Sequence, residues 1–142
     1  ANRAIYTPVR LVSPAILTQL WWLNGTVVGP PNVDCGLYAA SESGAMTRIV
    51  STGTTVQCTS TTIQSVDVTD VALAPGLYYL ALALSVNNSG IFRLASAVAF
   101  QSRVAGFLKE ESAFPLPAVA TPVTITDLFA LPFCGFTTRV VI

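Results

Sequence analysis

Side chains capable of chemistry are few in this chain, and the most versatile of them is absent. The 142 residues contain no His, seven Asp and Glu together, and three Cys. General acid–base catalysis near neutral pH most often uses His. Nucleophilic arrangements of the Ser-His-Asp and Cys-His types need it as well. The composition therefore excludes both of these mechanisms.

The carboxylates offer two pairs that could act together. Asp67 and Asp70 stand three residues apart, and Glu110 and Glu111 are adjacent. A glycosidase needs two carboxylates that the fold brings to about 5–10 Å from each other. Solvated turns explain both pairs better, and no EF-hand spacing supports a calcium site that would include Asp127. We expect a protein that is not an enzyme and binds no cofactor and no metal.

The three cysteines lack the spacing of a metal site or of a disulfide framework. Their count is odd, and no CxxC pair occurs. Cys35 and Cys58 each share an alternation face with a nearby Val, which favours small buried side chains with free thiols. A single Cys35–Cys58 bridge is the alternative, because connectivity cannot be deduced from sequence.

Charge is scarce, and this limits the possible partners. The chain is 52% hydrophobic and 10% charged, with a net charge of zero, whereas soluble domains carry about 25% charged residues. The basic residues are scattered, which argues against nucleic acid and against an anionic membrane as partners. The longest apolar run, residues 71–84, is shorter than the roughly 20 residues of a spanning helix. The apolar excess instead predicts burial against other subunits in a homo-oligomer.

Strand-like patterns dominate the chain. Thr, Val, Ser and aromatic residues alternate between turn signals about every ten residues, which predicts an all-β antiparallel sandwich. The strands are expected at residues 15–23, 33–39, 46–51, 77–86 and 137–142, with strand character around 55–58 and 62–68 and a strand or short helix at 91–100. Pro75-Gly76 fits a type II turn. Both faces of 77–86 are apolar, so it should be central, with its second face covered by the chain itself or by a neighbour.

Prolines mark the two ends of a single predicted domain, residues 1–142. Residues 1–14 contain two prolines and are expected to form an N-terminal arm or an edge strand. Residues 106–136 combine four prolines with many large apolar side chains. Such a segment cannot form regular central strands, so we expect an extended arm that wraps an apolar surface.

Aromatic residues supply the candidate interface. Adjacent strand residues point to opposite faces, so one of Trp21 and Trp22 can fill the core while the other meets a partner. A role of this pair in the core alone and a sugar-stacking platform are the alternatives. The predicted interface residues are Trp21, Trp22, Tyr78, Phe107, Phe114, Phe129 and Phe133.

Two runs of sequence carry a family resemblance. They are NVDCGLYAASESGAMTRIVSTGTT at residues 32–55 and IQSVDVTDVALAPGLYYLALAL at residues 63–84. In order and in motif they resemble a β-sandwich module of structural proteins of tailed bacteriophages, whose members carry NVDVGIYD, RLVSTGST and a PG-x-YYLALA strand. This chain departs from the pattern at Cys35, where Val is usual, and at Ala39, where Asp is common.

The resemblance implies a role in a virus particle and no catalytic role. It implies a jelly-roll-like sandwich that assembles with its own copies and with other virion proteins. The part would be a head decoration, a neck or a tail component, made in the bacterial cytoplasm and incorporated into the virion. The alternative is a carbohydrate-binding or receptor-binding adhesion module of a phage tail.

Overall fold

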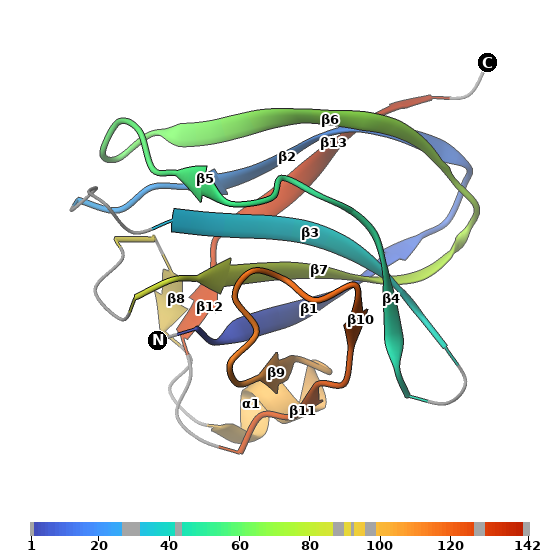
Figure 1. Ribbon diagram of the computed structural model, residues 1–142. Coiled ribbons are helices and arrows are strands. Elements are labelled where there is room, and N and C mark those ends of the chain that lie inside the picture. The colour runs from blue at the N-terminus through green and yellow to red at the C-terminus, as the bar shows by residue number, and fades with distance from the viewer. Residues whose placement is uncertain are drawn as a thin grey trace.

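The fold is an antiparallel β-sandwich, as the sequence predicts (Figure 1). The computed structural model describes residues 2–26, 32–41, 44–86, 90–91, 93–95, 99–126 and 130–140. One sheet, here called the small sheet, has the strand order β13 (Cys134–Val140), β2 (Ala15–Leu23), β6 (Ile63–Leu73). The other, the large sheet, is centred on β3 (Asn32–Ala40), β7 (Gly76–Leu84) and β1 (Ala4–Leu11).

Shorter strands extend the large sheet on both sides. Its full order is β10 (Val119–Ala120), β4 (Met46–Ser51), β3, β7, β1, β9 (Leu108–Glu110), β11 (Val123–Thr124), and β5 (Thr55–Val56) also pairs with β3. A separate ribbon pairs β8 (Arg93–Ala95) with β12 (Ala130–Pro132). The helix α1 (Ala99–Val104) has six residues. In the described part of the chain no helix has the length and hydropathy needed to cross a bilayer.

Most strand predictions are confirmed, and three details differ. Strands at 15–23 and 46–51 match β2 and β4, and those at 33–39 and 77–86 match β3 and β7 to within two residues. The segment 91–100 contributes both a short strand and the start of α1. The last strand begins at Cys134, three residues before its predicted start at Thr137. The predicted type II turn is wrong: Gly76 has no positive φ and already pairs with Leu11 in the β1–β7 ladder.

The N-terminal segment is not an edge strand along its whole length. The first three residues of β1, 4–6, lie between β7 and β9 in the interior of the large sheet. Beyond Tyr6 the pairing with β9 stops, so the part of β1 that contains Pro8 has only β7 beside it. Proline is tolerated there because one side of that stretch needs no ladder hydrogen bonds.

Two clusters of buried side chains lie on opposite faces of the large sheet. The inner core, between the two sheets, is formed by Leu17, Leu20, Trp22, Val33, Cys35, Leu37, Leu73, Leu80, Leu82 and Ile91. The arm core, on the far face, is formed by Ala4, Tyr6, Tyr38, Met46, Ala81, Ala83, Ala113, Leu116 and Ala120. Alternate residues of β7 therefore enter different clusters, which confirms its central position with both faces covered.

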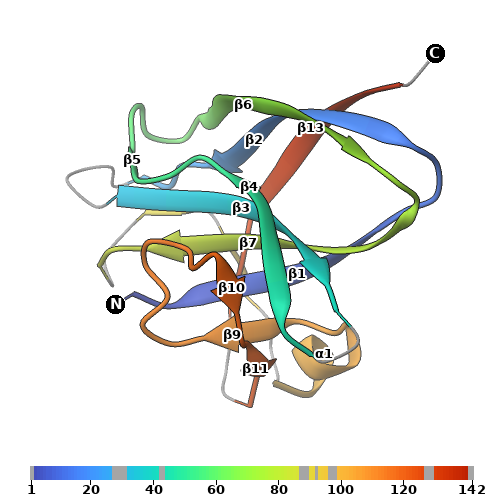
Figure 2. The same ribbon diagram turned by 45° about the vertical axis from the view of Figure 1, so that its right-hand side comes forward.

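The second face of the large sheet is covered by the chain itself. Ala113, Leu116 and Ala120 of the arm core belong to the Pro-rich segment. Figure 2 shows this orange segment crossing the face of β7 and β3 between β9 and β10. Of the two possible covers for β7, the structure therefore uses the chain's own arm.

Candidate functional site

The arm docks on three alternate residues of β3. Asp34, Gly36 and Tyr38 point away from the inner core, and all three are buried. Leu116 sits over Gly36: a Cβ at position 36 would lie 2.9 Å from Leu116 Cδ1 and 3.1 Å from the carbonyl oxygen of Val50. The first of these distances is shorter than real Cβ contacts, and the second is tighter than most of them. The glycine therefore leaves the space that the leucine fills.

Side chains of the large sheet satisfy the backbone of the docked arm. Asp34 Oδ2 accepts a hydrogen bond from the Leu116 N–H at 2.9 Å, and Arg48 donates to the carbonyl oxygen of Leu116. The Tyr38 hydroxyl donates to the carbonyl oxygen of Pro117 at 2.6 Å. Buried backbone groups need such partners, and a segment outside regular strands must obtain them from side chains. Burial raises the pKa of Asp34, while the Leu116 hydrogen bond and Arg48 favour its ionised form.

A second contact ties the start of the arm to β1. The Tyr6 hydroxyl donates to Glu110 Oε2 at 2.7 Å, and Glu110 Oε1 accepts from the Thr121 N–H at 3.0 Å. The rings of Tyr6 and Tyr38 meet edge to face, with centroids 5.4 Å apart. Glu110 therefore connects Tyr6 of β1 with Thr121, at the end of the docked segment.

The tyrosines make stability sensitive to alkaline pH. Burial raises the pKa of Tyr6, helped by its bond to Glu110, and burial likewise raises the pKa of Tyr38 against the opposing effect of Arg48. A raised pKa in the folded state means that stabilisation is complete below the unfolded value of about 10 and is lost above it. We expect the free energy of unfolding to fall as pH rises beyond about 10.

Urea titrations at a series of pH values measure this slope. The Tyr38→Phe variant should be less stable at neutral pH, because it loses the bond to Pro117, but its alkaline slope should be flatter. Tyr78→Phe is the control, since that hydroxyl donates only to the nearby carbonyl of Ala74. Equal slopes for wild type and Tyr38→Phe would show that Tyr38 does not couple protonation to folding.

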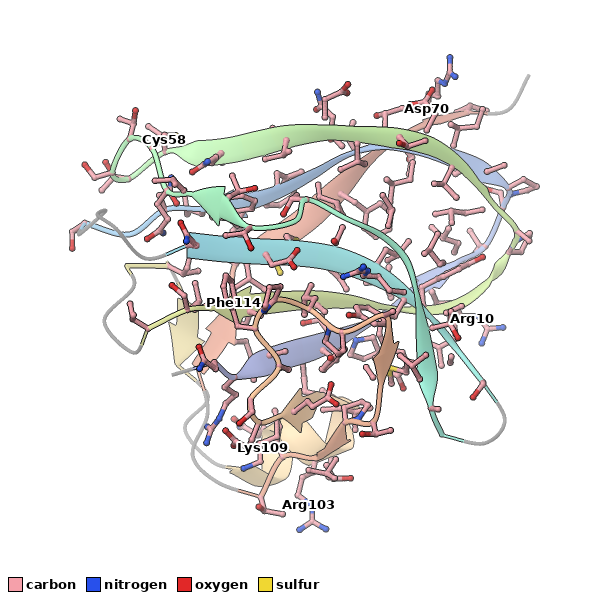
Figure 3. The ribbon with its side chains drawn as sticks, viewed as in Figure 1. Arg10, Cys58, Asp70, Arg103, Lys109 and Phe114 are labelled. Atoms are coloured by element: carbon pink, nitrogen blue, oxygen red, sulfur yellow. The ribbon has the colours of Figure 1, made fainter. Side chains whose placement is uncertain are left out.

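The structure shows the surroundings of the four carboxylates considered from sequence. Glu110 is engaged by Tyr6 and Thr121, whereas Glu111 forms an ion pair with Arg3 at 2.7 Å. Asp67 and Asp70 are exposed on β6, and Figure 3 shows Asp70 near the end of the small sheet. Within the described ranges no three His, Cys, Asp or Glu side chains group closely enough to hold a metal ion.

The three cysteines differ in how far they are exposed to solvent. All three are free; Cys35 is buried, Cys134 is half-buried and Cys58 is exposed. Burial was correctly predicted for Cys35 and wrongly for Cys58, which lies in the loop between β5 and β6 (Figure 3). That loop carries Cys58 out of the sandwich, so the alternative Cys35–Cys58 bridge is not formed.

The two tryptophans point to opposite faces of β2, as predicted. Trp22 is completely buried in the inner core, and its Nε1 donates to Asn24 Oδ1 at 2.8 Å. Trp21 is half-buried on the outer face of the small sheet. Its ring lies across Gly135 and 6.2 Å from the ring of Phe133.

An apolar surface surrounds Trp21. Leu23 pairs with Ile63 on one side, and its backbone N–H donates to the carbonyl oxygen of Phe133 on the other. Ile63 is 59% exposed and Phe133 is 45% exposed. We call these four residues, Trp21, Leu23, Ile63 and Phe133, the outer patch. Trp21 and Leu23 belong to β2, Ile63 begins β6, and Phe133 directly precedes β13.

The remaining predicted interface residues are placed elsewhere. Tyr78 packs against the inner core and Phe114 against the arm core, where Figure 3 shows Phe114 over the large sheet. Phe107 is half-buried next to β9, and Phe129 lies outside the described residues. Of the six predicted residues that the structure describes, only Trp21 and Phe133 meet on an open face. Leu23 and Ile63 were not among the predicted interface residues; the alternating pattern of residues 63–68 was the signal available for Ile63.

Comparisons with protein-family models, curated proteins and solved structures find no match to this chain.

Proposed function

We propose that this chain is a non-enzymatic structural subunit of a tailed-bacteriophage particle, as a head decoration, neck or tail component. It assembles with its own copies and with neighbouring virion proteins through the outer patch. The observation that carries the proposal is that this patch stays exposed although the arm covers the other apolar face of the sandwich.

The outer patch has the composition of an interface centre. It combines Trp and Phe with two aliphatic residues and contains no charge, and aromatic residues are enriched at interface cores while charged residues are depleted there. The residues next to the patch are polar. Ser65 pairs with Trp21, and Gln19 pairs with both Asp67 and Thr137. An apolar centre with a polar rim is typical of protein–protein contacts.

The phage-like motif has a structural explanation that supports the proposal. Within NVDCGLY, Asp34, Gly36 and Tyr38 hold the arm, and the resembling phage motif NVDVGIYD has the same three residue types. Cys35, where the motif has Val, faces the inner core, so a small apolar side chain suits either sequence. The shared residues are therefore the ones that a sandwich with a docked arm requires.

Sedimentation velocity over a wide concentration range tests assembly. We expect the wild-type protein to form oligomers as concentration rises, and Ile63→Glu to weaken association at least tenfold, or about 1.4 kcal/mol. Val12→Glu is the matched control, because Val12 is 86% exposed and precedes the opposite end of β2. A wild-type monomer at every concentration, or an equal effect of both substitutions, would contradict assembly through the outer patch.

The adhesion alternative uses the same surface differently. A sugar ring could stack on the exposed part of Trp21 beside Phe133, but Trp22 is buried and offers no second platform. A glycan array separates the two functions. Binding that Trp21→Ala abolishes, by a protein that stays monomeric, would replace the structural proposal with the adhesion one.

A further inference from the structure

Two thiols enter the inner core from opposite sheets. Cys35 of β3 is opposite Leu82 of β7, and Cys134 of β13 is opposite Trp22 of β2. Directly opposed residues of an antiparallel pair share a face. Leu82 and Trp22 are both buried between the sheets, so the two cysteine side chains also point there.

Both side chains therefore belong to the same core. Cys134 packs against the inner core that contains Cys35. The neighbouring Cys134 thiol, together with burial, holds the pKa of the Cys35 thiol well above its usual range. The reactive thiolate is therefore scarce at neutral pH, and oxidation of the pair should be slow.

We propose that Cys35 and Cys134 are a cross-linking site, at which a disulfide joins the large sheet to the small sheet when the protein meets a small-molecule disulfide. The Cys134 thiolate attacks the oxidant, for example oxidised glutathione, and releases one glutathione thiol. Cys35 then loses its proton and displaces the second glutathione thiol, which leaves the Cys35–Cys134 bond. Two protein thiols are oxidised and one glutathione disulfide is reduced.

The surroundings suit such a bond. Immunoglobulin sandwiches place an inter-sheet disulfide against a buried Trp, and here Trp22 is the residue opposite Cys134. The bond would link residues 35 and 134, which are 99 positions apart in the sequence. Closing so long a loop restricts the unfolded chain strongly. The proposal does not depend on the proposed particle function.

The test is oxidation of the native full-length protein with oxidised glutathione, followed by alkylation of the remaining thiols and peptide mass spectrometry. We expect a Cys35–Cys134 linked peptide in monomeric protein. Cys58 should be alkylated or carry glutathione, because it is exposed. The melting temperature should rise by about 5–15 °C and return to its starting value on reduction.

Single substitutions separate the pair from the third cysteine. Cys35→Ala and Cys134→Ala should each abolish the linked peptide and the rise in melting temperature, whereas Cys58→Ser should retain both. The mass spectrum of the wild-type protein decides the question even if a core variant fails to fold. Cross-linking of Cys58 instead, or of Cys35 to Cys134 only after denaturation, would overturn the proposal.

Discussion

Replacing Gly36 with valine is expected to lower the free energy of unfolding by about 3 kcal/mol, because the new side chain competes with the arm for space. A Cβ there would lie 2.9 Å from Leu116 Cδ1, 3.1 Å from Ser51 Cβ and 3.1 Å from the carbonyl oxygen of Val50. Leu116 Cδ1 is the end of a flexible side chain, whereas the carbonyl oxygen of Val50 belongs to the backbone of β4. Urea unfolding followed by circular dichroism measures the loss.

A matched glycine and a double-mutant cycle show whether the arm is responsible. Gly76→Val should change stability by no more than about 0.5 kcal/mol, since a Cβ there meets only Tyr78 Cε2, at 3.7 Å. Leu116→Ala alone should cost about 2–5 kcal/mol, but clearly less when valine already occupies position 36. Additive losses would mean that Gly36 and Leu116 do not share one site.

Replacing Trp22 with alanine is expected to cost about 3–5 kcal/mol, a large part of the 5–15 kcal/mol that stabilises a typical domain. Trp22 has 0% exposure and fills the inner core. Its loss also removes a donor from Asn24 Oδ1, which accepts from Gln57 Nε2 as well, while Asn24 Nδ2 donates to Gln64 Oε1 at 2.9 Å. The cavity therefore opens beside a buried polar network.

The neighbouring tryptophan is the natural control for this substitution. Trp21→Ala removes a half-buried ring from the outer patch, so its cost should be about 1 kcal/mol. Its main effect should instead be weaker association in sedimentation experiments. Guanidinium unfolding monitored by circular dichroism compares the two variants without relying on tryptophan fluorescence. Equal losses of stability for Trp21→Ala and Trp22→Ala would contradict the division of roles between core and surface.

The sequence predicted those features that depend on local alternation. Period-two patterns placed β2, β3, β4 and β7, and they predicted that Trp21 and Trp22 face opposite ways. The apolar character of both faces of residues 77–84 also predicted a second covering layer. Alternation is a property of neighbouring residues, so it can be recognised in the sequence without knowing which strands pair.

Features that depend on distant pairing could not be predicted in the same way. Asp34 is a polar residue on the strand face away from the inner core, a pattern typical of a solvated side chain, but the arm about eighty residues later buries it. Leu23 and Ile63 become one surface only through the register of β2 with β6. The approach of Cys134 to Cys35 needed a strand that begins at 134, and the Pro-rich composition of 106–136 concealed that start.

The most direct test of the account is the position of this chain in the density of intact particles purified from the source of the sequence. We predict density for the sandwich in the particle shell, neck or tail, with Trp21, Ile63 and Phe133 against a neighbouring subunit. Residues 113–120 should cover the large sheet of their own chain. Absence of the chain from the particle, or an outer patch that faces solvent while another surface makes the contacts, would contradict it.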